Sequence, residues 1–321
     1  LYLKLEMPEQ AYARFQDSVI RFPTYFDTYS GLVALVEADQ PVDDLMRGIV
    51  DYYAGQYGLA IIALERYMFE NPDHDGTALY YKAYSHYELG EYDQEIATWD
   101  VLIDEHPVDQ YLATAYLEKA SSLWRFMQDY EGAANTLLHY AARYPESERT
   151  PEFLSLAGEI FEIGGYLTKA SETWQRVFNE YPGTDGAYPA LFKAGIVNYR
   201  LQRYEDARLV FQRLLVLATT PEDRAAASFW IAKCLEAEGE DEQALTYYQQ
   251  AADVDPTGYY GIRGRQKDAG EAPFPRQYNS DIAIDLEQEK MEAEKWLRAT
   301  FSVDQWVDLQ SFTDLLNDPL F

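Results

Sequence analysis

The chain has 321 residues, with 55 aspartates and glutamates against 26 lysines and arginines, and a formal net charge of −29. This balance argues against nucleic acid and anionic lipid as ligands, because both require a basic surface. Hydrophobic residues make up 47% of the chain, which is ample for a packed core, whereas one cysteine and four histidines exclude a disulfide framework and a cysteine-cluster metal site. No apolar stretch approaches the roughly 18 residues of a membrane span. We therefore predict no transmembrane segment, no metal and no cofactor.

One pattern recurs along the first 256 residues. A glycine precedes an aromatic or other helix-starting residue, an alanine follows three positions later, a large residue four positions after that, and a proline eight positions further on. In chain order the copies are Ala11, Phe15 and Pro23; Gly55, Tyr57, Ala60, Leu64 and Pro72; Gly90, Tyr92, Trp99 and Pro107; Tyr130, Ala133, Leu137 and Pro145; Gly165, Leu167, Ala170, Trp174 and Pro182; Tyr204, Ala207, Phe211 and Pro221; and Gly239, Asp241, Ala244, Tyr248 and Pro256.

The pattern predicts pairs of packed helices. Glycine ends the first helix of a pair, since it tolerates a positive φ at the turn. The alanine lets the second helix approach its neighbour, the large residue fills the groove, and the proline ends that helix. The stretches Thr77 to Leu89 and Ala187 to Leu201 show the apolar period expected of first helices. We therefore predict an all-α solenoid.

Over residues 1 to 256 the chain resembles the tetratricopeptide-repeat family. The resemblance implies a right-handed superhelical solenoid of about seven helix pairs. Two features depart from the pattern: Glu95 stands where alanine is expected, and the 49-residue spacing from Ala11 to Ala60 leaves room for an extra helix near residues 30–37. The first copy shows only the second helix of a pair. Because an open solenoid end exposes apolar surface, we expect further repeats or a partner before Leu1.

Aromatic residues form the candidate binding site. In tetratricopeptide superhelices the first helices of the pairs line the concave wall, and that register places seven rings there. A tyrosine offers a flat ring and a hydroxyl, which suit a sugar face or an extended peptide. The alternative is that these rings pack between neighbouring helices. The predicted residues are Tyr52, Tyr53, Tyr80, Tyr84, Tyr87, Phe126 and Tyr199.

The composition changes after Pro256, so residues 257–321 are predicted to form a small helical linker region. Helices are expected over Asp285 to Thr300 and Ser302 to Leu316, the second opening with a capping box. The segment that follows the repeats resembles the junction after the helical arm of soluble lytic transglycosylases. The residues that carry this resemblance are Tyr259, Tyr260, Gly261, Arg263 and Arg265, together with the later Glu292 to Leu297.

That second resemblance implies a non-catalytic arm that positions peptidoglycan glycan strands or partner proteins in the cell envelope. Catalysis would lie in a further domain, because no Gly-Leu-Met-Gln-like stretch occurs and Glu146-Ser147 falls in a solvated turn. The competing hypothesis is a stand-alone acidic adaptor that binds a protein or peptide partner, in the cytoplasm. Fold alone does not decide between the two.

Three smaller candidates have ordinary structural explanations. Asn71, Asp73, Asp75 and Gly76 resemble the start of a calcium loop, but Lys82 stands where a bidentate glutamate is required, which favours turn and cap chemistry. The histidines His74, His86, His106 and His139 show no ligand spacing. Cys234 lies in an apolar helical stretch, so we expect a buried, inert thiol.

Overall fold

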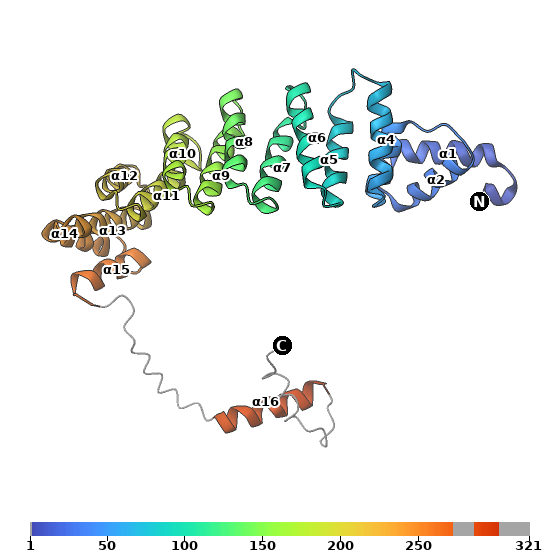
Figure 1. The fold of residues 1–321 in the computed structure, drawn as a ribbon. Helices are drawn as coiled ribbons and strands as arrows, with labels where there is room; N and C mark the ends of the chain where they lie inside the picture. The colour runs from blue at the N-terminus through green and yellow to red at the C-terminus, as the bar shows by residue number, and fades with distance from the viewer. Residues whose placement is uncertain (1, 272–285, 302–321) are drawn as a thin grey trace. The chain divides into compact units, whose positions relative to one another are not determined.

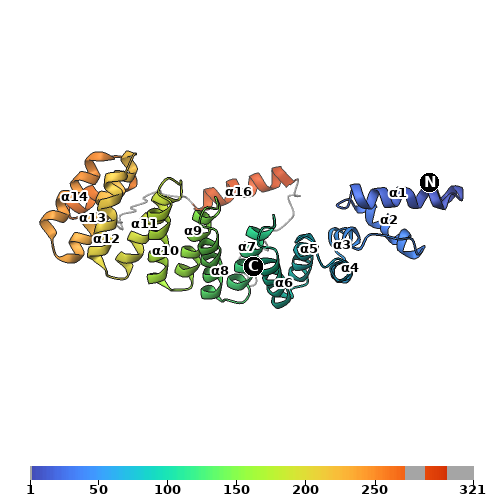
Figure 2. The ribbon, with the colours of Figure 1, turned by 90° about the horizontal axis from the view of Figure 1, so that it is seen from above.

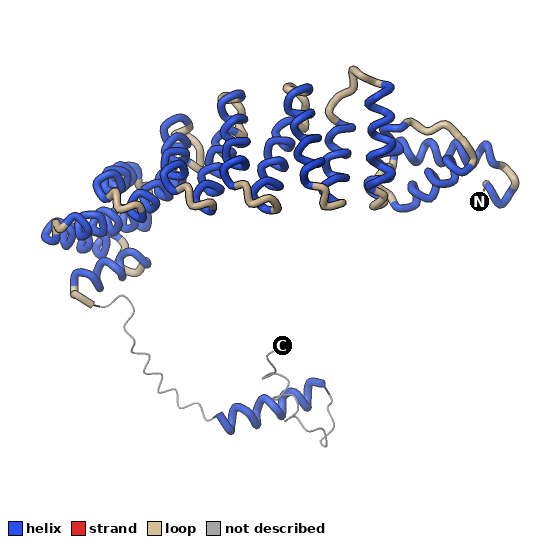
Figure 3. The backbone as a smooth tube through the Cα atoms, in the orientation of Figure 1, coloured by secondary structure: helices blue, strands red, loops and turns tan. Residues whose placement is uncertain are grey.

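The computed structural model describes residues 2–271 and 286–301 of the chain (Figure 1). Within these residues the secondary structure consists of helices and connecting loops, with no strand (Figure 3). The chain divides into two compact units, Leu1–Asp268 and Ala269–Phe321. The predicted all-α class is confirmed.

Nearly all of the helices belong to the first unit. Its elements before the middle of the chain are a 3₁₀ helix, Leu3–Leu5, and α1 Pro8–Arg21, α2 Phe26–Glu37, α3 Asp44–Tyr53, α4 Tyr57–Glu70, α5 Thr77–Glu88, α6 Tyr92–Glu105, α7 Leu112–Arg125 and α8 Tyr130–Arg143. They are followed by α9 Thr150–Ile163, α10 Leu167–Glu180, α11 Ala187–Arg200, α12 Tyr204–Leu217, α13 Pro221–Glu238, α14 Asp241–Val254 and α15 Tyr259–Asp268.

From α3 to α14 the helices pack as successive pairs. Each helix contacts the one before and the one after it in the chain, and the helices follow one another in sequence order in both views (Figures 1 and 2). The odd-numbered helix of each pair is the predicted first helix, and the even-numbered one carries the alanine and the large residue. The predicted solenoid of tetratricopeptide-like helix pairs is confirmed.

The turns inside the pairs have the predicted backbone conformation. Gly55, Gly90, Gly165 and Gly239 have φ values of 72°, 73°, 82° and 84°. In the α11–α12 pair, whose sequence lacks the glycine, Gln202 occupies the left-handed region at φ 61°, and Gln128 does the same before α8 at φ 57°. These two turns are therefore strained, because a side chain costs about 1–2 kcal/mol in that region.

Replacing Gln202 by glycine is expected to raise the free energy of unfolding by about 0.5–1 kcal/mol, since glycine adopts this φ without steric cost. Urea unfolding followed by circular dichroism measures the change. The matched control is Gln212→Gly inside α12, where glycine is expected to destabilise by a similar amount. The explanation fails if both substitutions shift stability in the same direction.

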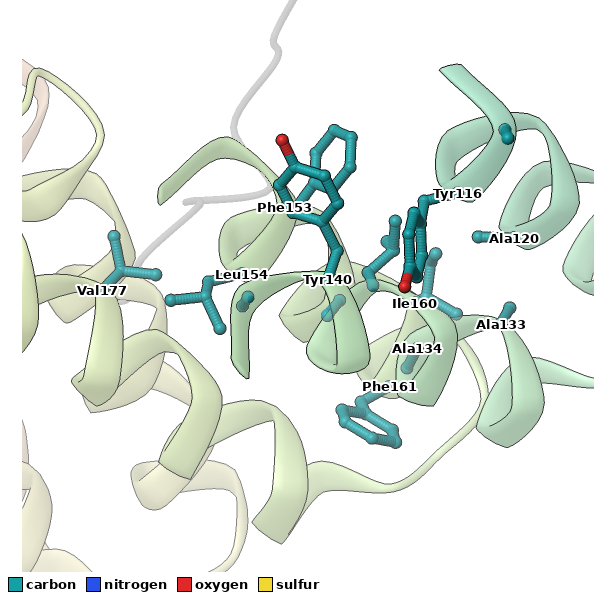
Figure 4. Packing of buried hydrophobic residues seen from close by; sticks show 14 of the residues in the cluster. Tyr116, Ala120, Ala133, Ala134, Tyr140, Phe153, Leu154, Ile160, Phe161 and Val177 are labelled. Carbon is teal, nitrogen blue, oxygen red and sulfur yellow. The ribbon is translucent and has the colours of Figure 1, made fainter. Parts of the chain in front are cut away.

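The core between the helices follows the small-and-large pattern of the sequence. A Cβ on Gly158 would lie 2.4 Å from Nε1 of Trp174, and one on Gly195 would lie 2.7 Å from the ring of Phe211. In these two pairs the large ring therefore requires a glycine opposite it. From α5 to α11, one cluster of buried side chains continues from each pair to the next. Figure 4 shows this for the middle of the unit, where the rings of Tyr140 and Phe153 lie with centroids 4.6 Å apart.

Glu95, which stands in place of the repeat alanine, is buried between two pairs. Its carboxylate accepts hydrogen bonds from Nε1 of Trp99 at 3.0 Å and from Oγ of Ser122 at 2.7 and 2.9 Å. Burial raises the pKa of this carboxyl, and the two hydrogen bonds oppose that rise. The residue that breaks the sequence pattern therefore links α6 to α7 through a satisfied polar contact.

Further polar contacts join successive pairs. The hydroxyl of Tyr144 donates to the carbonyl of Pro107 at 3.1 Å, and the hydroxyl of Tyr181 donates to the carbonyl of Pro145 at 2.9 Å. Basic side chains also pair with carboxylates on neighbouring helices. These pairs include Lys82 with Glu65, Lys119 with Asp100, Lys169 with Glu131, Lys193 with Glu159, Arg200 with Glu162 and Arg208 with Glu238. Because acids outnumber bases so widely, the surface that remains is acidic.

Before the regular pairs, α1 and α2 pack on each other. The ring of Phe15 fills the space beside Gly31, where a Cβ would lie 2.9 Å from Cδ1 of the ring. The helix near residues 30–37 is present as α2 but begins earlier, at Phe26. Tyr25 precedes it in an extended conformation, which sets the start of the helix.

At the other end of the unit, α15 packs on α13 and α14. A Cβ on Gly261 would lie 1.8 Å from the carbonyl oxygen of Asp255, and one on Gly264 would lie 2.5 Å from that of Tyr248, so glycines permit this close approach. Residues 257–268, which the sequence assigns to the linker region, thus pack as the last helix of the first unit.

The second unit contains α16, Leu286–Phe301, over the stretch predicted as Asp285 to Thr300. Its side chains Met291 and Trp296 are exposed. The expected helix over Ser302 to Leu316 lies outside the described residues.

Candidate functional site

The seven predicted aromatic residues fall into three groups. Tyr52 and Tyr53 belong to α3, and Tyr80, Tyr84 and Tyr87 to α5. Phe126 directly follows α7, and Tyr199 lies in α11. The structure brings together the first four rings, then Tyr87 with Phe126, and places Tyr199 elsewhere.

The first group is packed between helices. The Tyr80 ring stacks on that of Tyr111 with centroids 4.1 Å apart, and the Tyr84 ring meets Trp99 edge-on at 5.4 Å. Tyr52 and Tyr53 both contact Tyr81, at 5.4 and 6.0 Å. Tyr52, Tyr80 and Tyr84 are thus half-buried in ring contacts between helices, whereas Tyr53 remains 48% exposed.

Carboxylates lie against these tyrosine hydroxyls. The hydroxyl of Tyr84 donates to Oε1 of Glu118 at 3.1 Å, and burial together with that carboxylate raises the pKa of Tyr84. Burial, and after it the charge of Glu88, raises the pKa of Tyr52 to about 12. Both hydroxyls stay protonated at neutral pH, and that of Tyr84 acts as a hydrogen-bond donor.

The second group borders an open cleft. The rings of Tyr92 and Phe126 stack with centroids 4.0 Å apart and planes 5° from parallel, and Tyr87 meets Phe126 edge-on at 5.8 Å. The side chain of Phe126 is 42% exposed, and that of Met127 beside it is 43% exposed. This arrangement presents a flat aromatic surface to solvent.

We name this cleft the turn cleft. It has a volume of about 580 Å³ and lies where α5 turns into α6 and α7 ends. Its lining residues are Gly90, Glu91, Tyr92, Asp93, Gln94, Phe126 and Met127. Glu91 accepts a hydrogen bond from Nδ1 of His86 at 2.7 Å, which fixes its carboxylate at the cleft edge. The cleft thus combines two stacked rings with two carboxylates.

The third group is again a packed one. The Tyr199 ring lies 5.2 Å from that of Tyr204 and 5.4 Å from that of Trp230, and the ammonium group of Lys233 lies 5.9 Å above it.

A separate acidic cleft of about 500 Å³ lies between α9 and the start of α11. Among its lining residues are Glu148, Glu152, Leu156 and Glu159.

Sequence reasoning missed Tyr92 and Met127, which complete the turn cleft. The sequence did contain a signal for Tyr92. In three helix pairs, a tyrosine before the turn is followed five residues later by a tyrosine after it. These are Tyr52 with Tyr57, Tyr87 with Tyr92, and Tyr199 with Tyr204, and each pair is in ring contact. Met127 carried no comparable signal.

The linker-motif residues have structural contacts in α15. Tyr260 packs on Phe229 with ring centroids 5.7 Å apart, and Nη2 of Arg265 donates to the carbonyl of Pro256 at 3.0 Å. Arg263 donates to Gln266, and Tyr259 is exposed. Tyr260 therefore packs α15 on α13, and Gly261 permits its close approach to the end of α14, whereas Arg263 makes its contact within α15.

The smaller candidates behave as turn and core residues. Oδ1 of Asp75 accepts from the amide of Thr77 at 3.0 Å, which is the predicted turn chemistry. His74 and His106 lie with ring centroids 5.1 Å apart, a proximity that their sequence spacing did not indicate. In the part of the chain that the structure describes, no group of three or more His, Cys, Asp or Glu side chains is placed to hold a metal ion. Cys234 is buried as predicted, and burial raises the pKa of its thiol to about 12.

Comparison with known proteins supports the fold. The model of the family described as tetratricopeptide repeat matches residues 45–109 and 192–259. The solved structure of Naa15/Naa10 bound to HypK-THB has a TM-score of 0.53 at 15% identity, over 92% of this chain and 42% of that chain. No curated protein matches the sequence.

Two further solved structures are similar. One is the C-terminal part of a TPR repeat-containing protein from Cytophaga hutchinsonii, with 15% identity, a TM-score of 0.49, and coverage of 78% of this chain and 98% of that chain. The other is a tetratricopeptide repeat protein from Parabacteroides merdae, with 16% identity, a TM-score of 0.40, and coverage of 81% of this chain and 98% of that chain.

Among the described helices, none combines the length and the apolar character needed to cross a membrane. The helix pairs from α3 to α14 thus form a tetratricopeptide-like solenoid, with family matches at both ends of that array.

Proposed function

We propose that this chain is a protein-interaction scaffold that binds an extended basic segment of a partner protein in the turn cleft. The observation that carries the proposal is the stack of half-buried Tyr92 on exposed Phe126, beside the carboxylates of Glu91 and Asp93.

The chemistry of the turn cleft suits a lysine or arginine side chain. An aromatic face attracts a cation, and a carboxylate adds a charge-assisted hydrogen bond. Met127 supplies a flexible apolar contact that adapts to different segments. The net charge of −29 steers basic partners toward the chain and repels acidic ones.

The test measures peptide binding by fluorescence anisotropy. The probe is a labelled twelve-residue peptide of arginine, lysine and proline, compared with the same peptide carrying glutamate at every basic position. The wild-type chain is expected to bind only the basic peptide, and Phe126→Ala is expected to weaken that binding about three- to thirtyfold, which corresponds to one cation–π contact.

The matched control is Tyr204→Ala, at the position in the α11–α12 turn that corresponds to Tyr92 in the α5–α6 turn. It should leave binding unchanged, while Tyr92→Ala should weaken it. Equal binding of the two peptides, or equal effects of the Tyr92 and Tyr204 substitutions, would contradict the proposal.

The narrower assignment to the arm of a peptidoglycan lytic transglycosylase in the cell envelope stays a prediction. It depends on the resemblance of residues 259–265, which in the structure pack α15 against the solenoid. Soluble glycan strands serve as a third probe in the same assay. Binding of glycan strands in place of the basic peptide, lost with Phe126→Ala, would favour that assignment over a protein partner.

A further inference from the structure

A second surface on α4 is apolar and exposed. Leu59, Ile62 and Phe69 are 44%, 52% and 89% exposed, and they lie on one face of the helix at positions i, i+3 and i+10. Arg66, at i+7, is held by a two-point contact with Asp44, at 2.6 and 3.1 Å. We call these four residues the α4 stripe.

Apart from the pairing of Arg66 with Asp44 of α3, the contacts of α4 with its neighbours lie on another face. The helix packs on α3 and α5 through this face, on which Ala60, Ala63 and Leu64 are buried. Exposed apolar side chains on a single face, outside the core, indicate an interaction surface.

The stripe of α4 is more apolar than the same positions in the other repeats. The repeat alanine fixes the register, so the four stripe positions can be read on every second helix of a pair. The corresponding residues are Gln94, Ala97, Val101 and Asp104 in α6; Gly132, Asn135, His139 and Ala142 in α8; Lys169, Glu172, Arg176 and Asn179 in α10; and Gln243, Thr246, Gln250 and Asp253 in α14. These sets are mainly polar or small, which is the pattern expected of a solvated face.

The closest parallel is on α12, where the stripe positions hold Asp206, Leu209, Arg213 and Val216. Leu209 and Val216 are exposed there too. Arg213 donates to Asn179 of the preceding pair at 3.0 Å and lies over the ring of Phe178, much as Arg66 on α4 is held by Asp44. The two faces differ at the first position, where α12 has Asp206 in place of Leu59. Only α4 presents three large apolar side chains at these positions.

We propose that the α4 stripe is a docking surface for an amphipathic helix of a partner protein with basic residues along its edges. An amphipathic helix binds by packing its apolar face against exposed apolar side chains, and the stripe offers these at helical spacing. The stripe is flanked by the exposed carboxylate of Glu70 and by Glu65, which also pairs with Nζ of Lys82 at 2.8 Å. The net charge of −29 adds to the negative potential of this surface. Charge complementarity therefore selects a basic helix, and it disfavours a second copy of this chain, which would bring the same carboxylates together.

The experiment uses the full chain and an eighteen-residue amphipathic peptide of leucine and lysine, with a photo-crosslinking group on its apolar face. The peptide is expected to bind and to crosslink to α4. A triple variant, Leu59→Gln, Ile62→Thr and Phe69→Asp, gives α4 the residues found at these positions in α14. It is expected to lose at least tenfold in affinity while its circular dichroism stays that of the wild type.

The matched control is Leu209→Thr with Val216→Asp on α12, which also removes exposed apolar side chains and adds one carboxylate. It is expected to keep wild-type affinity. Three results would overturn the proposal: equal losses in both variants, equal binding of a leucine and glutamate peptide, or a wild-type dimer in sedimentation equilibrium that the triple variant abolishes. Phe126→Ala should leave this binding intact, so failure here and failure in the turn cleft are distinguishable.

Discussion

Replacement of Trp174 by alanine is expected to lower the free energy of unfolding by about 3–5 kcal/mol. The indole is fully buried in the core that joins α9 and α10, and its Nε1 donates to the carbonyl of Ser155 at 3.1 Å. Alanine would leave a large cavity facing Gly158, which has no side chain to fill it. The carbonyl of Ser155 would also lose its indole donor. Urea unfolding followed by far-ultraviolet circular dichroism measures the loss.

The control for Trp174 is Phe69→Ala, because that ring is also large but lies on the surface of α4. It is expected to change stability by less than about 0.5 kcal/mol. Because a repeat array can unfold in parts, hydrogen exchange of the α9 and α10 amides should show the largest loss of protection in the Trp174 variant. A loss below about 1 kcal/mol, or one spread evenly over all pairs, would contradict the packing described for this site.

The pH dependence of stability is expected to change when Asp51 is replaced by asparagine. Asp51 is 2% exposed, and Nε of Arg47 lies 3.8 Å from its carboxylate. Burial raises the pKa of Asp51 from 3.8 to about 6, against the opposing charges of Arg47 and Arg66. The folded chain therefore holds a proton that the unfolded chain releases between about pH 4 and pH 6.

This bound proton sets the direction in which stability changes with pH. The contribution of Asp51 to stability is highest below pH 4, is lost as the pH rises through the folded-state pKa, and stays lost above it. The rise in the pKa of Asp51 corresponds to a loss of about 3 kcal/mol of stability between pH 4 and pH 7. Asp51→Asn should remove this slope and be the more stable protein at pH 7.

Unfolding free energies of the wild type and the variant, measured from pH 3.5 to pH 8, give the difference directly. Ser228→Ala provides a control, because Ser228 is equally buried but does not titrate in this range. It should shift the whole profile without changing its slope. A wild-type profile parallel to that of Asp51→Asn would mean that Asp51 stays ionised in the folded chain at pH 4.

The sequence predicts the helix pairs because their determinants are local and repeated. The stretch ending at Leu89 is a helix to Glu88, and the one ending at Leu201 is a helix to Arg200. Gly55 and its equivalents take the positive φ that only glycine adopts freely. These features depend on residues close together in the chain, and they recur about every 37 residues. A single sequence is therefore sufficient to detect them.

The candidate site was harder to predict, because contacts between helices decide it. The register shows that Tyr80 and Tyr84 share one face of a helix, but not that Trp99 and Tyr111 lie against their rings. The same limit applies to Glu95, whose departure from alanine is visible in the sequence. Its hydrogen bond to Ser122, 27 residues away, requires knowledge of how α6 meets α7.

The hydroxyl contacts of Tyr144 and Tyr181 have a mechanical consequence. Each joins the end of one second helix to the loop after the preceding second helix, so it fixes the distance between successive pairs along one edge. At the equivalent position after α4 the residue is Asn71, whose amide instead donates to its own helix, to the carbonyl of Tyr67 at 2.9 Å. The loops after α4 and α6 are joined in another way, by the amide of Gly76 and Oδ2 of Asp109 at 2.8 Å. Under a pulling or bending force, the array should therefore be stiff from α4 to α10 and more compliant before α4, so that deformation by a bound partner would concentrate on the N-terminal side of the α4 stripe.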